Sequence, residues 1–161
     1  MKIRLADKRD VVQIKILLDR NFDEVMSKYH SRAVLEKFKS HNTQESLLSQ
    51  MKRNKVYVAE DASGKVVATG AFADFGSEGK PKYCVSNFYV MPENHSQGIG
   101  RALFNELYRE AETRRAVSFH VPSSRNAVGF YEKMGFAVDE DQPDAHDEIT
   151  WMTMSGGTSN G

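Results

Sequence analysis

The chain has 161 residues but only one cysteine, four prolines and one tryptophan. The lone thiol, Cys84, excludes an intramolecular disulfide and any zinc site that needs several cysteines. No apolar run approaches the ~20 residues that cross a bilayer. The opening MKIRLADKRD also lacks the apolar stretch of a secretory signal. We therefore expect a soluble cytoplasmic protein with no membrane partner.

Charge of neither sign is in excess, because 22 Lys and Arg residues balance 22 Asp and Glu residues. A chain without a basic block argues against a nucleic-acid partner held by phosphate contacts. Hydrophobic residues make up 40% of the chain and charged residues 27%, as in an ordinary globular protein. The length suits one domain, since domains hold roughly 100–200 residues. We expect a single domain over residues 1–154 and a disordered tail over residues 155–161.

Helical spacing dominates the first third of the chain and returns after residue 97. Asp7 is the expected N-cap of the first helix, with Asp10 three residues on in its first turn, and apolar side chains then recur every three or four positions. The expected helices cover residues 11–25, residues 31–38, a segment after a cap at Thr43 or Ser46, a segment from Gln97 or Gly98, and residues 124–134.

Strand patterns fill the middle and the end of the chain, with turn residues between them. The expected strands are residues 2–5, 56–60, 66–74, 83–90, 117–121, 136–139 and 148–154. Residues 56–90 predict an antiparallel meander, and a strand–loop–helix–strand unit follows it. The order of elements indicates the α/β (α+β) class.

The loop after the strand at residues 83–90 carries the most information. Gly98 and Gly100 stand where the next helix begins. Glycine lets a ligand approach the backbone, and the first N–H groups of a helix have no internal partner. The helix dipole adds partial positive charge, so such a turn suits phosphate or pyrophosphate. Arg101 adds a full charge beside it.

Several phosphate-binding motifs can be compared with this loop. The P-loop string GxxxxGK[ST] is absent, and a dinucleotide fingerprint lacks its third glycine because position 103 is Leu. Two interpretations remain. Either the loop binds the pyrophosphate of coenzyme A, or the two glycines merely ease the chain into the helix.

Two sequence blocks resemble a known family. VMP at residues 90–92, followed by QGIGRAL at residues 97–103, is similar to the acetyl-CoA loop of the GNAT N-acetyltransferase superfamily. AVGFYEKMGF at residues 127–136 resembles that family's late helix. The blocks stand in the family's order with a strand between them, and the resemblance covers nearly all of residues 1–154. It implies a mixed, mostly antiparallel central sheet of about seven strands flanked by helices.

The resemblance implies direct transfer of an acetyl group from acetyl-CoA to a primary amine of a small molecule or protein, without a metal. It makes Tyr131 the general acid, since a phenol of pKa about 10 stays protonated near neutral pH. A homodimer is common in the family. The residues implied to bind acetyl-CoA are Phe88, Tyr89, Val90, His95, Gln97, Gly98, Ile99, Gly100, Arg101, Asn126 and Phe130.

The sequence departs from the family pattern at three places. His95 stands where the family usually has Gln or Arg, and Ser124 stands where it often has Asn, with Asn126 two residues on. Residues 84–88 contain no carboxylate, although many relatives place a general base there. These departures leave room for a catalytically weak or inactive acetyl-CoA-binding module. An unrelated nucleotide-binding domain is the third alternative.

The general base and the roles of several other polar residues stay open at this stage. A water polarised by Ser86, Asn87 or a carbonyl group is one solution, and the remaining base candidates are Asp74, Glu78 and His120. Cys84 is expected to be an inert strand residue, not an acyl carrier. Arg125 and Lys133 either reach coenzyme A phosphates or lie on a solvated face.

A run of acidic residues near the C-terminus bears on the amine that accepts the acetyl group. Six acids either steer a cationic amine or are ordinary solvated turn charges. They are Asp139, Glu140, Asp141, Asp144, Asp147 and Glu148. His146 and Asp147 lack the further clustered ligands that a metal site needs.

Overall fold

One sheet runs through the whole molecule. The structure is a computed structural model that describes residues 1–142 and 147–156. Its strands lie in the order β1-β2-β3-β4-β5-β7-β6; β4 and β5 are parallel, and the other neighbours are antiparallel. The mixed seven-stranded sheet is therefore confirmed. The strands are β1 Lys2–Leu5, β2 Lys55–Glu60, β3 Val66–Asp74, β4 Tyr83–Val90, β5 Ser118–Ser123, β6 Ala137–Val138 and β7 Thr150–Ser155.

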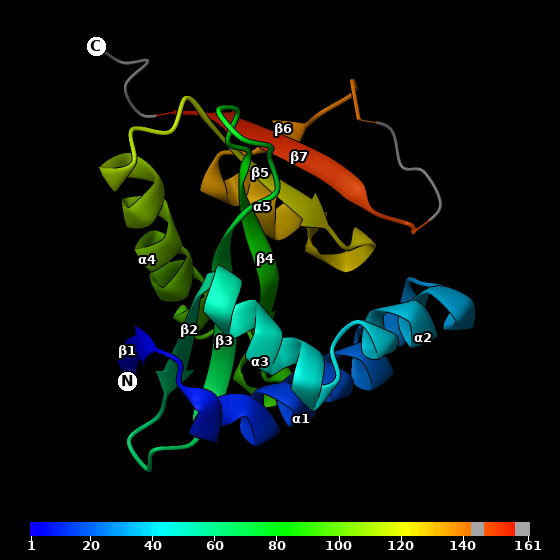
Figure 1. The fold of residues 1–161 in the computed structure, drawn as a ribbon. Helices are drawn as coiled ribbons and strands as arrows, with labels where there is room; N and C mark the ends of the chain where they lie inside the picture. Colours follow the sequence, from blue (N-terminus) through cyan, green and yellow to red (C-terminus); the bar gives the residue numbers. More distant parts are fainter. Residues whose placement is uncertain (143–146, 157–161) are drawn as a thin grey trace.

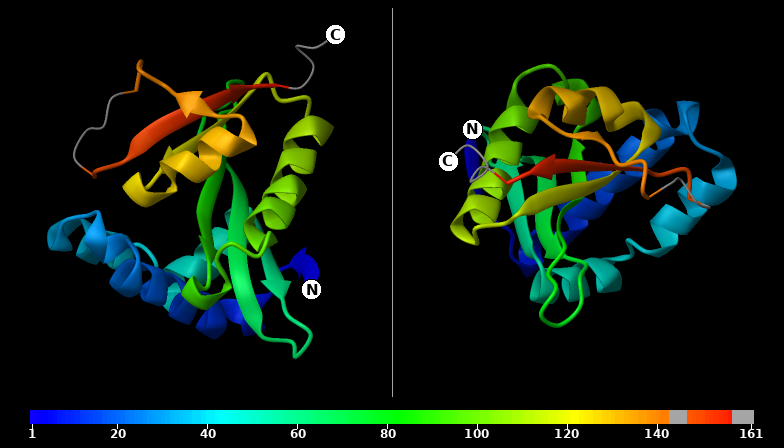
Figure 2. Two further views of the ribbon diagram at one scale, coloured as in Figure 1. Left: turned by 180° about the vertical axis from the view of Figure 1, so that it is seen from behind. Right: turned by 90° about the horizontal axis from the view of Figure 1, so that it is seen from above.

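Helices cover both faces of this sheet, as Figures 1 and 2 show. Helices α1, α2 and α3 lie together on one face of the β1–β4 half. Helices α4 and α5 lie on the opposite face, with α4 packed on β3 and β4. The helices are α1 Val11–Glu24, α2 Arg32–Ser40, α3 Gln44–Arg53, α4 Ile99–Thr113 and α5 Val128–Met134. Short 3-10 turns occur at Lys8–Asp10, Met26–Lys28, Pro92–Asn94 and Arg125–Ala127.

Local signals set most of the helix ends. Thr43, and not Ser46, caps α3, because its Oγ1 accepts the Ser46 N–H at 3.1 Å. The helix predicted over residues 124–134 is a 3-10 turn followed by α5. It ends at Gly135, whose φ of +110° takes the left-handed conformation that glycine allows.

The C-terminal boundary differs from the prediction. Strand β7 continues through Ser155, and the Gly156 N–H donates to the Val117 carbonyl at 2.7 Å. The prediction of a disordered tail is therefore wrong for these two residues, because backbone pairing along β5 holds them although their side chains offer nothing to the core. Residues 157–161 lie outside the described part of the chain.

Strand β4 contains a bulge that changes which side chains face which helices. Ser86 pairs with Ala71 and Tyr89 pairs with Thr69, so two residues, Asn87 and Phe88, stand opposite Gly70. Asn87 adopts φ +45°, a left-handed conformation that asparagine tolerates better than most residues. A Cβ on Gly70 would lie only 2.7 Å from Phe88 Cδ2, so glycine is needed where the bulged strand crosses β3.

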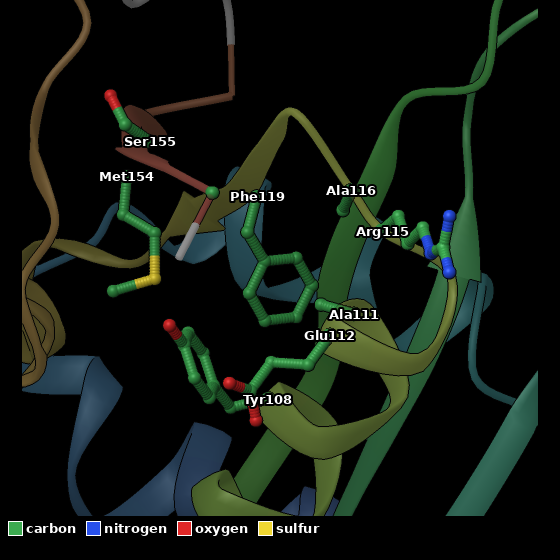
Figure 3. A pocket seen from close by; sticks show the side chains of 9 residues that line it. Tyr108, Ala111, Glu112, Arg115, Ala116, Phe119, Met154 and Ser155 are labelled. Carbon is green, nitrogen blue, oxygen red and sulfur yellow. The ribbon is translucent and has the colours of Figure 1, made fainter. Parts of the chain in front are cut away.

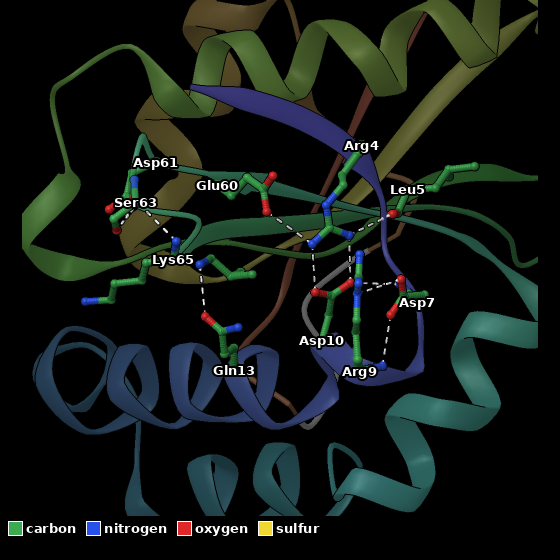
Figure 4. A network of polar contacts seen from close by, with 11 residues as sticks. Arg4, Leu5, Asp7, Arg9, Asp10, Gln13, Glu60, Asp61, Ser63 and Lys65 are labelled. Atoms are coloured by element: carbon green, nitrogen blue, oxygen red, sulfur yellow. Dashed lines mark hydrogen bonds and ion pairs between the residues drawn. The ribbon is translucent and has the colours of Figure 1, made fainter.

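An ion-pair network joins the first strand to the first helix (Figure 4). Arg4 donates to both carboxylate oxygens of Asp10, at 2.8 and 2.9 Å, and to Glu60 at 3.2 Å. Asp10 Oδ2 also accepts the Asp7 N–H at 2.8 Å, which completes a capping box with the predicted N-cap. The hydrogen bond from Arg4 lowers the pKa of Asp10 below its ordinary value. Charge pairing and capping thus fix the start of α1 against β1 and β2.

Replacing Asp10 by asparagine should destabilise the fold. The Asp10 side chain is 3% exposed, so Arg4 would lose a buried partner. We expect the free energy of unfolding at pH 7, measured by urea denaturation, to fall by about 2–3 kcal/mol. Glu36→Gln, which removes the acid of an exposed pair with Arg32, should leave the urea midpoint unchanged.

The pH dependence of stability separates the charge of Asp10 from its shape. Because the folded pKa is depressed, the stabilisation is present above the ordinary carboxyl value and is lost as pH falls through the folded pKa. The difference between the wild type and Asp10→Asn should therefore shrink below pH about 4. An equal difference at pH 3 and pH 7 would show that the ion pair is not its source.

Candidate functional site

The two parallel strands in the middle of the sheet separate almost as soon as they meet. Within the described residues, the register of β4 with β5 holds one pair, Cys84 with His120. Toward their carboxyl ends, β5 is paired with β7 along its whole length, while β4 keeps its pairing with β3. Figure 2 shows the β5–β7 part turned away from β3 and β4. Ligands of such sheets bind where neighbouring strands diverge at their carboxyl ends.

The glycine loop lies at the end of β4 and leads into α4. Ser96 and Gly98 have φ of +66° and +79°, and the first backbone bond of the helix runs from the Ala102 N–H to the Gly98 carbonyl at 3.1 Å. Among the described residues, no hydrogen bond from the backbone N–H groups of residues 96–101 is present. These donors and the positive end of α4 could bind an anionic group.

Side chains of the loop serve different ends. His95 Nε2 lies 2.9 Å from the Val90 carbonyl, so the imidazole holds the loop against the end of β4. Gln97 accepts a hydrogen bond from Asn94, and Ile99 is buried in the core. Arg101 is exposed and can turn toward an anion at the helix start.

The two glycines of the loop do not have the same role. A Cβ on Gly98 would meet nothing within 4 Å, so the space beside the free N–H groups is open there. A Cβ on Gly100 would lie 3.2 Å from Phe130 Cε1. Gly100 therefore permits close contact between α4 and α5, whereas Gly98 supplies the left-handed turn and the open approach.

An aromatic cluster fills the space between β4 and α5. The ring of Phe88 lies 5.6 Å from that of Phe130 and 6.2 Å from that of Tyr131. Tyr131 is 4% exposed, and burial, with a smaller effect of Tyr89, raises its pKa. Among the described residues, no hydrogen bond of its hydroxyl group is present. The phenol is thus protonated and without a competing partner. Asn126, in contrast, is exposed on the 3-10 turn before α5.

The candidates for a general base lie around strands β4 and β5. Both ring nitrogens of one candidate, His120, already make hydrogen bonds within the protein. His120 contacts Ser118 Oγ through Nε2 at 2.9 Å and Thr153 Oγ1 through Nδ1 at 3.1 Å. Since Thr153 donates to Asp139, His120 Nδ1–H donates to Thr153 and Nε2 accepts from Ser118. Burial, with Lys82, lowers the pKa of His120. Neither ring nitrogen faces a free position.

The other base candidates are structural or exposed. Asp74 accepts the N–H groups of Gly76 and Lys82 and so closes the β3–β4 turn, while Glu78 is exposed in that turn. Burial raises the pKa of the Cys84 thiol to about 12, which is consistent with the expected inert strand cysteine.

Part of the acidic segment is already engaged within the protein. Lys37 pairs with Asp147 at 2.7 Å, and Glu148 accepts the Ser31 N–H at 2.8 Å and faces His30 Nδ1 at 3.2 Å. The Ser31 N–H is the main cause of the lowered pKa of Glu148.

The other polar residues predicted near this segment differ in their surroundings. Asp139 accepts hydrogen bonds from Gln142 and Thr153. Arg125 lies 3.9 Å from Glu148, and Lys133 is exposed on α5. Asp144 and His146 lie outside the described residues. Glu140 and Asp141 are exposed, as the solvated-turn interpretation predicts, whereas Asp139, Asp147 and Glu148 make specific contacts that the local sequence pattern does not reveal.

Asn21 is a site residue that the sequence analysis missed. It is 4% exposed, and its Nδ2 donates to the carbonyls of Leu17 and Val90, both at 3.0 Å. The end of β4 is thereby anchored to α1. The available signal was a polar side chain on the apolar face of a helix, next to Phe22.

One cavity in the described structure lies away from this site. It has a volume of about 230 Å³ and lies between the C-terminal end of α4 and strands β5 and β7 (Figure 3). Tyr108, Glu112 and Arg115 line its polar side, and Phe119 and Met154 its apolar side. The helix start with free N–H groups lies at the opposite end of α4.

A strand pair that separates and a helix N-terminus with free N–H groups beside it are consistent with a transferase that binds an acyl-CoA. The family model described as an acetyltransferase (GNAT) domain matches residues 24–156. The chain belongs to the GNAT acetyltransferase family. No curated protein sequence matches the chain.

Solved structures share the fold at low sequence identity. PaiA N-acetyltransferase from Thermoplasma acidophilum, in complex with coenzyme A, matches with a TM-score of 0.79 and 19% identity, covering 96% of this chain and 98% of its own. Ribosomal-protein-alanine N-acetyltransferase from Brucella melitensis matches with a TM-score of 0.69 and 19% identity, covering 96% of this chain and 99% of its own. Phosphinothricin acetyltransferase from Sinorhizobium meliloti, in complex with acetyl-CoA, matches with a TM-score of 0.72 and 15% identity, covering 97% of this chain and 88% of its own.

In the described part of this chain, no helix is both long and apolar enough to span a membrane.

A charge placed at Gly98 should test the anion site. Asparagine and aspartate tolerate the left-handed conformation and have nearly the same size, and the position is open. We expect Gly98→Asp to weaken coenzyme A binding about tenfold or more relative to Gly98→Asn, because a carboxylate would repel the pyrophosphate. Isothermal titration gives both dissociation constants. Equal affinities of the two variants would remove the pyrophosphate from this loop.

Proposed function

We propose that this protein transfers the acetyl group of acetyl-CoA directly to a primary amine within a ternary complex, with Tyr131 as the general acid. The observation that carries the proposal is the buried phenol beside Phe88 and Phe130, at the place where β4 and β5 separate. Its raised pKa keeps the proton available for the leaving group.

The reaction balances without a cofactor other than acetyl-CoA. The neutral amine attacks the thioester carbonyl carbon, and a tetrahedral intermediate forms with negative charge on oxygen. A backbone N–H near the end of β4, around Val90, stabilises this charge. Collapse breaks the carbon–sulfur bond, and the thiolate takes its proton from Tyr131. The tyrosine recovers a proton from the nitrogen of the product through solvent.

A direct transfer is favoured over an acyl-enzyme. An acyl-enzyme on Cys84 would need a thiolate, and the pKa of about 12 opposes one near neutral pH. The proposed base is a water molecule polarised by Ser86, Asn87 or a backbone carbonyl group, since both nitrogens of His120 are engaged. Burial of the amine disfavours its charged form and eases this step.

Membership of the family indicates that the acetyl acceptor is an amine, but not which kind of amine. The similar structures carry the names of enzymes for a ribosomal-protein alanine and for phosphinothricin, so this fold accepts both a protein amine and a small amine. We propose the same two classes here. An acetyl-CoA-binding module without catalysis is the second candidate, because residues 84–88 hold no carboxylate and His120 is occupied.

Two measurements test the proposed function. The first is the shift in melting temperature with acetyl-CoA, coenzyme A, NAD and ATP; a ligand at 100 times its dissociation constant adds about 2.7 kcal/mol. The second is release of free coenzyme A thiol with amino acids, diamines and peptides as acceptors, with the acetylated amine identified by mass spectrometry. A shift with acetyl-CoA but no product with any amine would favour the inactive module.

Tyr131→Phe separates binding from turnover. The ring stays in the aromatic cluster, so we expect the dissociation constant for coenzyme A to stay unchanged. The kcat should fall about a hundredfold, because the thiolate loses its proton donor. Tyr108→Phe, which removes a hydroxyl group beside the cavity near the C-terminal end of α4, is the control and should keep the wild-type kcat. A Tyr131→Phe enzyme with the wild-type kcat would remove Tyr131 from the catalytic mechanism.

A further inference from the structure

Three side-chain amides meet at the bulge of β4. Asn87 Nδ2 donates to Asn42 Oδ1 and to Gln50 Oε1, both at 2.8 Å. Gln50 Nε2 in turn donates to Asn42 Oδ1 at 3.2 Å. Asn42 is 7% exposed in the turn between α2 and α3, and Gln50 lies on α3. We call these three residues the amide cluster.

Two backbone carbonyls fix the orientation of every amide in the cluster. Asn42 Nδ2 donates to the Phe38 carbonyl at 2.9 Å, so Asn42 Oδ1 must face Asn87 and Gln50. Gln50 Nε2 donates to the His41 carbonyl at 3.3 Å, so Gln50 Oε1 must face Asn87. Carbonyl oxygens only accept, which leaves no alternative set of flips. Both protons of the Asn87 amide are therefore committed.

The cluster is linked through one residue to the aromatic side of the site. Asn87 holds φ +45° at the bulge, and the next residue, Phe88, sends its ring to Phe130 and Tyr131 on the opposite face of the sheet. A glycine could adopt this φ at no steric cost, but it would give the bulge no attachment to α3. The amide cluster supplies that attachment, in partly apolar surroundings that include Leu47 and Met51.

We propose that Asn42 and Gln50 are positioning residues for acetyl transfer. Through Asn87 they lock the β4 bulge and so hold Phe88 against Tyr131. They touch neither the acetyl group nor the amine, and act on the geometry of the catalytic tyrosine and of the β4 backbone. This inference rests on the proposed role of Tyr131 and extends the site to α3, a helix with no other assigned part in the reaction.

Gln50→Leu is the direct test, since leucine fills a similar volume but accepts no hydrogen bond. Misplacing a catalytic group by a fraction of an ångström lowers kcat, and we expect a fall of about tenfold or more. The KM for acetyl-CoA and the dissociation constant for coenzyme A should change by no more than about threefold. Hydrogen exchange of the amides in residues 86–89 should become faster. Gln44→Leu, on the exposed start of the same helix, is the matched control and should match the wild type.

Asn87→Gly provides a second, independent variant, because it keeps the backbone conformation and removes the amide. It should show the same loss of kcat with coenzyme A binding retained. Folded Gln50→Leu and Asn87→Gly proteins with kcat within about twofold of the wild type would overturn the positioning role alone. If the wild type transfers acetyl to no amine in the panel, the proposed function falls and this inference falls with it. Circular dichroism confirms folding in every case.

Discussion

The extra residue in β4 is the constraint on which the rest of the site depends. Side chains alternate along a regular strand, so Val85 and Phe88, three positions apart, would face opposite sides of the sheet. The bulge at Asn87 puts Phe88 on the α4 and α5 face, where Val85 already packs with Phe104. Without it, Phe88 would point toward α1 and the contact with Tyr131 could not form. Gly70 on β3 provides the space that this arrangement needs.

Separation of β4 from β5 also creates a hydrogen-bonding problem, which side chains solve. Buried backbone carbonyls must be paired, yet β5 leaves β4 after the pair Cys84 and His120. At the far end of β4, Asn21 donates to the Val90 carbonyl from α1, and His95 approaches the same oxygen from the loop. Polar side chains thus replace the missing strand. The end of β4 can remain a defined edge for a ligand and need not close into a continuous sheet.

Local patterns were sufficient for the elements and for the loop, because caps and periodicity act over a few residues. Asp7, Thr43 and Gly135 set helix ends as their chemistry predicts. The bulge was not predictable, since it depends on the register between β3 and β4. The hydrogen-bond partners of Glu148 and Asn87 were not predictable either, because they lie 117 and 45 residues away in the chain. A sequence pattern shows that a residue is polar, but not which distant group will satisfy it.

The two glycines of the loop after β4 also have roles that the sequence pattern alone does not distinguish. In the sequence alone, one explanation would cover both Gly98 and Gly100: either they let a ligand approach the backbone, or they allow the chain to turn into the helix. The structure assigns each explanation to one glycine, because the missing Cβ of Gly98 faces open space while that of Gly100 faces Phe130. The two roles depend on each other. Close packing of α5 on α4 places the aromatic cluster beside the helix start, so an anion bound by the free N–H groups would lie near Tyr131, the proposed proton donor. The loop and the late helix are therefore parts of one site, which explains why their motifs occur together in the chain.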